Sequence, residues 1–326
     1  MKKFTAIGIV IIFALLSFIS CEKKPAAPSS GAAQANDMLS LLPVDAQGVL
    51  FIDIQRIMAI DAVDEIIKEE ENEESYQKYQ EFIEKTGIDP KEDIYSIAAS
   101  ATKGEGKEIK TVSFVLNLKY SRETLLPLIK ENMEEGEEFT EKEYDGFTIY
   151  TIKKEGEKEV NFAFLDDSNI SAGNEEGVKS VIDVLQKKRE NVFKNDSLAA
   201  LLADANKGAI LWGAFAIPPE VKEEMTGASP MLKDIEAINA ASLSFDYKNK
   251  SFIAEIKLLT GDPDKSRQIA DSLNGLKMMG SMIQIQDFNM GEVLDNIEIT
   301  AGPDHVNIYA SFPEELLDKL KEKEKK

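Results

Sequence analysis

The sequence predicts an α+β protein made of two tandem units, each with a mainly antiparallel sheet covered by helices on one face. Three observations support this prediction. Short apolar or alternating segments typical of strands recur along the chain, and helical segments directly follow several of them. The order of these segments in residues 38–190 returns in residues 191–326, which indicates a duplicated unit joined between Gln186 and Asn206. Coincidental agreement between two runs of strands and helices is the alternative.

The first unit is expected to open with a buried strand at Gly48–Ile54, behind the turn residues Pro43 and Asp45. A long acidic helix should run from Asp61 to Thr86, because apolar residues recur along one side and Gly87 follows as a helix terminator. The later segments follow the same patterns: strands at 94–101 and 110–118, a helix behind Ser121, a hairpin of strands at 147–152 and 160–165, a strand at 169–172 and a helix at 175–188.

The second unit is expected to repeat this order. Its predicted elements are strands at 208–217, 238–247 and 251–259, a helix opening at Asp262, a hairpin of strands at 296–300 and 306–311, and a closing helix at 313–321. The first three strands match 48–57, 94–101 and 111–118, and the late hairpin matches 147–165. In both halves a helix follows directly after the third strand, which is why we infer duplication.

The amino-acid composition and net charge limit the classes of molecule that this protein is expected to bind. The chain carries 59 acidic and 38 basic residues, a net charge of -21, so it should be repelled by nucleic acid and by anionic lipid headgroups. It has a single cysteine, Cys21, and therefore no internal disulfide. Stability must come from burial of apolar side chains, which form 43% of the residues.

Cys21 follows an apolar segment, residues 4–19, that opens with Lys2 and Lys3 and is short for a membrane span. Leu16-Ser-Phe-Ile-Ser-Cys21 resembles the lipobox of bacterial lipoproteins, with Phe18 where Leu is usual. The resemblance implies a signal peptide at 1–20 and diacylglyceryl, palmitate-type chains on Cys21. The protein would then be anchored to a membrane of the bacterial cell envelope, on its extracytoplasmic side, in the periplasm or at the cell surface. An ordinary secretory signal with a chance cysteine is the alternative.

Residues 22–36 are rich in Pro, Ala, Ser and Gly, so residues 21–37 are predicted to be the lipidated cysteine and a flexible tether. Beyond the tether, residues 41–57 resemble the opening of uncharacterised exported bacterial proteins, which begin Leu-x-Pro-x-Asp before a strand. That resemblance implies an envelope protein with repeated α+β units. It assigns no catalytic residue.

The sequence contains few residues in patterns typical of catalysis. The chain has one histidine, His305, in a predicted turn, and a dyad with Asp304 is not expected because adjacent strand residues point to opposite faces. Ser75–Lys78 and Lys85–Gly87 imitate two motifs of penicillin-interacting enzymes but lie together in one helix and its end. The oxygen-rich segments 166–169 and 262–264 are interpreted as a turn and a helix cap instead of a cation site. No catalytic residue, metal site or cofactor is therefore predicted.

Two features remain as ligand-binding candidates. Met278, Met279 and Met282 form a cluster that could line a pliable apolar groove, although helix core packing is the favoured interpretation. Trp212, the only tryptophan, lies in an apolar strand and is expected to pack in the second core.

The function predicted from these observations is binding or scaffolding without catalysis. The expected partners are the membrane, through the lipid on Cys21, and a protein or an apolar ligand. Two alternatives stay open: a carrier or sensor of an apolar ligand held in a cavity between sheet and helices, and a hydrolase that relies only on carboxylates.

Overall fold

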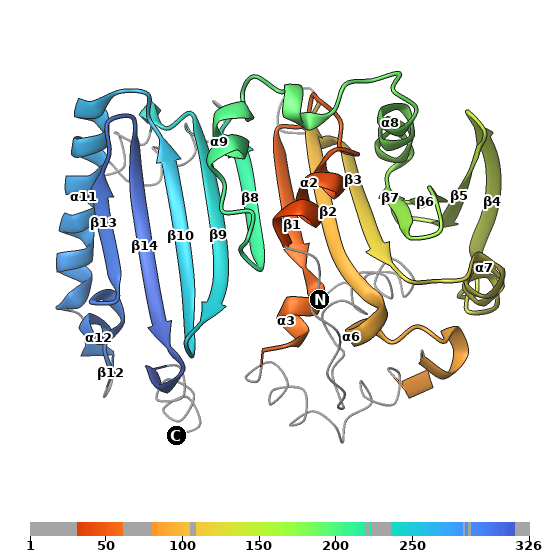
Figure 1. Ribbon diagram of the computed structural model, residues 1–326, viewed down its shortest axis with the longest axis horizontal. Helices are drawn as coiled ribbons and strands as arrows, with labels where there is room; N and C mark the ends of the chain where they lie inside the picture. Colours follow the sequence, from red (N-terminus) through yellow and green to blue (C-terminus); the bar gives the residue numbers. More distant parts are fainter. Residues whose placement is uncertain are drawn as a thin grey trace. The chain divides into compact units, whose positions relative to one another are not determined.

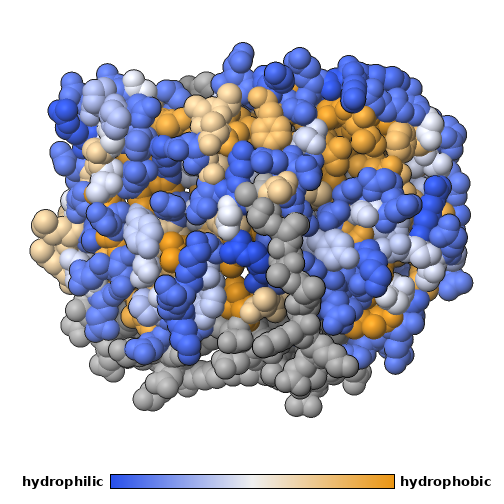
Figure 2. All heavy atoms as spheres, viewed as in Figure 1, coloured by the Kyte–Doolittle hydropathy of each residue, from blue (hydrophilic) through white to orange (hydrophobic). Residues whose placement is uncertain are grey.

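The computed structural model describes residues 31–60, 80–81, 83–104, 109–218, 222, 236–282, 284–285 and 288–316 (Figure 1). The chain divides into two units, residues 1–46 with 50–194 and residues 47–49 with 195–326. The pairings among β2 to β7 and among β8 to β14 are antiparallel, which confirms the predicted α+β class. In the face drawn in Figure 2, hydrophilic residues surround smaller apolar patches. Within the described ranges, no helix has the length and apolar character needed to cross a bilayer.

The first unit has the sheet order β1-β2-β3-β7-β6-β5-β4. Its strands are β1 (Gly48–Asp53), β2 (Ile94–Lys103), β3 (Ile109–Leu118), β4 (Glu137–Tyr144), β5 (Phe147–Lys154), β6 (Val160–Phe164) and β7 (Asn169–Gly173). Its helices are α2 (Gly31–Leu39), α3 (Ile54–Met58), α6 (Pro90–Asp93), α7 (Arg122–Glu131), α8 (Glu175–Leu185) and the 3-10 turn η1 (Val192–Lys194). The predicted hairpin of β5 and β6 is confirmed.

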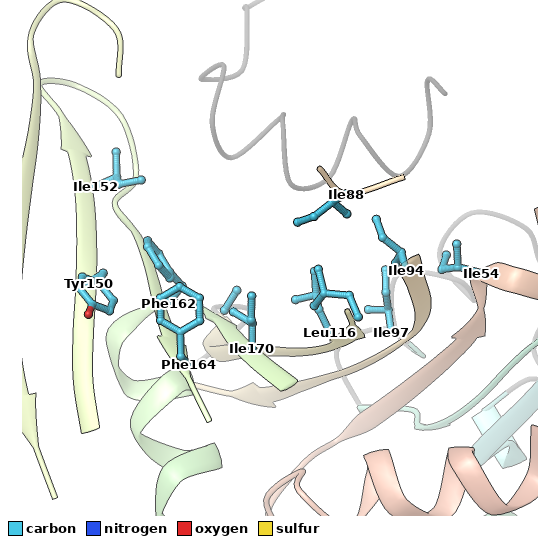
Figure 3. Close-up of a cluster of buried hydrophobic side chains, with 12 residues drawn as sticks. Ile54, Ile88, Ile94, Ile97, Leu116, Tyr150, Ile152, Phe162, Phe164 and Ile170 are labelled. Atoms are coloured by element: carbon cyan, nitrogen blue, oxygen red, sulfur yellow. The ribbon is translucent and has the colours of Figure 1, made fainter. Parts of the chain in front are cut away.

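One face of this sheet carries a large apolar core, shown in Figure 3. Tyr150 and Phe162 stack with their ring centroids 5.1 Å apart, and Phe164 lies edge-on to Phe162. Leu125 and Ile129 of α7 pack against this cluster. α7 therefore covers the face that the even-numbered residues of β3 present.

The opposite face of the same sheet is covered as well. Ser113 of β3 donates a hydrogen bond from its Oγ to the carbonyl of Gly177 in α8, over 3.1 Å. On α2, the Gln34 amide donates to the side chain of Asn117, which shares this face with Ser113. The expectation of helices on one face is wrong for this unit, because small residues under α8 let a second helix layer approach closely.

The predicted tether ends earlier than expected. Residues 31–39 form α2. Ala35 and Leu39 within this helix are fully buried, as is Leu42 just beyond it. Ala35, Leu39 and Leu42 recur at helical spacing, so this alanine-rich segment presents one apolar stripe. The tether prediction is wrong for residues 31–37. Cys21, and residues 61–79 and 82 of the predicted acidic helix, lie outside the described residues.

The second unit has the sheet order β13-β14-β10-β9-β8. Its strands are β8 (Leu211–Ala216), β9 (Ala240–Lys248), β10 (Ser251–Leu259), β13 (Ile297–Ala301) and β14 (His305–Pro313), with a separate pair β11 (Gln284–Ile285) and β12 (Phe288–Asn289). Its helices are α9 (Ala199–Asp204), α11 (Pro263–Ser281) and α12 (Met290–Leu294). The predicted closing helix begins at Glu314, one residue later than expected, because Pro313 pairs with Ser251 in β14; residues 317–321 lie outside the described residues.

α11 covers part of one face of this sheet. Its N-cap is Asp262, whose carboxylate accepts hydrogen bonds from the backbone N–H of Asp264 and Lys265, so the predicted cap is confirmed. Ile269 and Ala270 of α11 are buried in a small cluster with Val306 of β14. This core is smaller than that of the first unit, and it lies over β14 and β13.

Candidate functional site

β10, the middle strand of the second unit, is exposed at its centre on both faces. Consecutive strand residues point to opposite faces, and Glu255 and Ile256 are both exposed, Ile256 by 38%. None of the residues of β10 is buried. A central strand normally lies under a second layer of structure, so this part of the sheet is the first candidate for a binding surface.

The face on the side of Glu255 is polar, and we call it the polar face. Ser242, Lys257 and Asn307 lie directly opposite one another across β9, β10 and β14, so their side chains project together. In the next row, Ser244, Glu255 and the 38%-exposed Tyr309 are matched in the same way. Two adjacent rows of polar side chains therefore cross three strands.

A hollow of about 240 Å³ lies over these rows, and we call it the polar hollow. The carboxylate of Asp204, at the end of α9, forms an ion pair with the Lys257 ammonium and so connects the helix to the sheet. The polar hollow is lined by Asp204, Ala205, Asn206, Ser242, Leu243, Ser244, Glu255, Ile256, Lys257 and Asn307. All of these residues belong to the second unit.

A short hydrogen-bond chain leads from Asn307 to His305 and Asp304. The Asn307 amide donates to His305 Nε2 over 3.2 Å, and His305 Nδ1 donates to the Asp304 carboxylate over 2.6 Å. The neutral imidazole with its proton on Nδ1 satisfies both bonds. The His305 hydrogen bond, with a smaller contribution from Lys257, holds the pKa of Asp304 below its usual range.

Two expectations about His305 are wrong. Its side chain is only 16% exposed, and it begins β14 instead of lying in a solvated turn. The ring packs so closely on Gly302 that a Cβ there would lie 2.5 Å from it. Asp304 reaches the ring because it precedes the strand, where the alternation of faces does not apply.

The face on the side of Ile256 is apolar, and we call it the apolar face. Phe245 of β9 stacks on Phe252 of β10 with ring centroids 5.9 Å apart, and Tyr247 lies 5.0 Å from Phe252. All three rings are only partly buried, as is Leu243 beside Ile256. The core beneath α11 therefore continues into a partly exposed apolar strip.

The methionine cluster does not pack in the core, contrary to the favoured interpretation. Met278, Met279 and Met282 are 64%, 49% and 78% exposed, because the stripe of α11 that packs on the sheet runs through Ile269 and Leu273. Figure 2 shows a pale orange projection at the left edge, where Figure 1 places α11.

Trp212 is fully buried in β8, as expected for a core residue. It lies opposite Ser244, so it shares the polar face with Glu255, whereas α11 packs on the apolar face. The structure therefore brings Trp212 close to the rows beneath the polar hollow and does not bring it together with the methionines.

The oxygen-rich segment at 166–169 is a turn, as predicted. Asp166 Oδ1 accepts from the backbone N–H of Ser168 and Asn169, over 2.7 and 2.8 Å. Such an Asx turn occupies the carboxylate locally. In the part of the chain that the structure describes, no group of three or more His, Cys, Asp or Glu side chains is placed to hold a metal ion.

No family model and no curated protein matches the chain. Solved structures of TP0453 are similar in backbone. Crystal form III gives a TM-score of 0.49 at 11% identity, covering 86% of this chain and 96% of that one. Crystal form IV gives 0.47 at 12% identity, covering 90% and 99%.

Proposed function

We propose that this protein is a lipid-anchored binding protein on the extracytoplasmic side of the bacterial cell envelope, and that its second unit carries the binding surface. The observation that supports this most directly is the exposure of Glu255 and Ile256, adjacent residues of the central strand β10, on opposite faces of the sheet. A sheet whose central strand is exposed on one polar and one apolar face is suited to binding.

The anchor in this proposal is a diacylglyceryl group on the thiol of Cys21, with cleavage before it. Two acyl chains hold a protein at a membrane durably, because each buried methylene contributes about 0.8 kcal/mol. Cys21→Ser should release the protein from the membrane fraction and leave the fold unchanged by circular dichroism. Unchanged membrane fractionation of Cys21→Ser would contradict the anchor but not the binding surface.

We also propose that the two units arose by tandem duplication. The order α2, β1, β2, β3, α7 corresponds to α9, β8, β9, β10, α11, and the sheet order β1-β2-β3-β7-β6 corresponds to β8-β9-β10-β14-β13. The late hairpin of β13 and β14 therefore matches β6 and β7, and not the segment 147–165 expected from the sequence. In this correspondence α7 and α11 cover equivalent faces, while α2 and α9 lie on the other face. Corresponding chain order, sheet order and helix placement support duplication over coincidence.

The two alternatives from the sequence receive less support. A carrier needs an enclosed apolar cavity, whereas the polar hollow is small and lined mainly by polar side chains. A carboxylate hydrolase needs one carboxylic acid kept protonated by burial, but Asp204 and Glu255 at the polar hollow are both exposed.

Site-specific photo-crosslinking in the native host tests the binding surface. A photoreactive benzoylphenylalanine at position 256 should give discrete adducts in cells, because Ile256 lies on the open sheet. The matched control is position 109, because Ile109 is a 64%-exposed strand residue of the first unit. Equal adducts at both positions, or none at 256, would contradict the proposal.

A further inference from the structure

The polar hollow offers hydrogen-bond donors and acceptors side by side. Lys257 supplies donors only, Glu255 supplies acceptors only, and the hydroxyls of Ser242 and Ser244 supply both. The Asn307 amide nitrogen donates a hydrogen bond to the His305 ring. This bond fixes the orientation of the amide and leaves the Asn307 oxygen as an acceptor for a ligand. A ligand that satisfies this set must itself both donate and accept hydrogen bonds.

The charges around the polar hollow narrow the class of ligand. Two carboxylates, Asp204 and Glu255, face one ammonium, Lys257, which is already paired with Asp204. An anion would be repelled by this excess of negative charge and by that of the whole chain. A small cation would have to compete with Lys257 for Asp204, and an apolar ligand would leave the polar groups without partners.

We propose that the polar hollow binds a small neutral polyhydroxyl ligand, such as one monosaccharide unit, and this rests on the proposed binding function. Hydroxyl groups donate and accept at once, which matches the mixed lining. The volume of about 240 Å³ suits a ligand smaller than those of drug-sized pockets, which measure roughly 300–1,000 Å³. Tyr309, exposed beside Asn307 on the same face, offers an amphipathic ring at the rim.

Saturation-transfer difference NMR on the full chain in detergent micelles tests this inference. The probes are glucose, galactose, mannose and N-acetylglucosamine, with gluconate as an anionic relative of the same carbon skeleton. At least one neutral sugar should receive saturation from the protein, and gluconate should receive none. Absence of transfer to every neutral sugar, or equal transfer to gluconate, would overturn the inference.

Two variants assign the signal to the polar hollow. Ser242→Leu fills it and Asn307→Ala removes an exposed amide, so each should weaken sugar binding at least about tenfold, as expected when a polar partner is lost. Ser311→Leu is the matched control, because Ser311 lies on the same face of β14 but outside the hollow, and it should leave binding unchanged. Equal binding by Ser242→Leu, Asn307→Ala and Ser311→Leu would place the sugar elsewhere and overturn the inference.

The two proposals fail in different ways. If no sugar binds while position 256 still gives discrete adducts, the open sheet binds a partner and only the ligand class is wrong. If sugars bind at the hollow but position 256 gives no adduct, the polar hollow remains as a ligand site without a partner on the apolar face.

Discussion

The central strands of the two units differ sharply in burial. In β3, the strand of the first unit that corresponds to β10, the consecutive residues Val115 and Leu116 are 0% and 7% exposed, so both faces of the strand are covered. In β10 of the second unit, Glu255 and Ile256 are both exposed. If the two units arose by duplication, the same arrangement of strands is covered on both faces in the first unit and is exposed at its centre in the second unit.

The side chains beneath the covering helix explain this difference. Under α8 the sheet presents Ser113, Ser171 and Ala163, each fully buried and small enough for a helix to approach closely. On the corresponding face of β10 stand Glu255 and Lys257, and charged groups are seldom buried under a helix without partners. The polar face is therefore suited to solvent or a polar ligand.

The largest expected effect comes from truncating one phenylalanine in each unit. Phe162→Ala removes a 1%-exposed ring from the first core and should cost about 3–5 kcal/mol of unfolding free energy. Phe252→Ala removes a partly exposed ring from the apolar face and should cost about 1 kcal/mol. Urea unfolding followed by circular dichroism measures both. Equal losses would mean that the apolar face is packed as firmly as the first core.

Two glycines test how closely the helices lie on the sheets. A Cβ at Gly177 in α8 would lie 2.2 Å from the carbonyl oxygen of Val112, so Gly177→Ala should lower stability by about 1–3 kcal/mol despite the better helix propensity of alanine. A Cβ at Gly275 in α11 would meet nothing within 4 Å, so Gly275→Ala should raise stability by about 0.5–1 kcal/mol. Effects of the same sign at both sites, measured by thermal unfolding, would contradict this contrast.

Much of the fold could be predicted because its strands are apolar or alternate. β1, β3 and β10 lie close to their predicted positions, α8 begins at the predicted residue Glu175, and α11 follows its expected cap, Asp262. β4 has no predicted counterpart because glutamates dominate this exposed edge strand and hide its alternation. α2 has none either, because its alanine-rich composition resembles a tether until the burial of Ala35 and Leu39 is known.

The candidate site could be predicted only in part. Ser242, Ser244 and Asp246 alternate with apolar residues in β9, and that pattern indicates a polar face. The pairing of Asp204 with Lys257 depends on where α9 lies, and no local pattern specifies that contact between residues far apart in the chain. The exposure of Met278 depends on which stripe of α11 meets the sheet, because apolar residues occur on more than one side of this helix.

The first unit, whose sheet is covered on both faces, should also lose stability at alkaline pH. Burial, together with the carboxylates of Asp166 and Asp167, raises the pKa of Tyr120 to about 12. The unfolded chain releases this proton near pH 10 while the folded chain keeps it, so the contribution is complete below about pH 10 and is lost as pH rises towards 12. Tyr120→Phe should flatten this loss in urea unfolding series across that range. An equally steep loss in Tyr120→Phe would assign the effect to another group.

The smallest effect on stability is expected from Asp304 in the second unit. Its hydrogen bond to His305 lowers its pKa, so its contribution is present above its ordinary pKa of about 4 and disappears as pH falls through the lowered value. Asp304 is exposed, so Asp304→Asn should change acid unfolding only slightly. Trp212, the only tryptophan and fully buried in the second unit, reports this transition by fluorescence. If Asp304→Asn lowered the free energy of unfolding more than Phe252→Ala, the polar face would stabilise the second unit as strongly as the apolar face. The exposure of the polar face would then no longer indicate a surface that is reserved for a ligand.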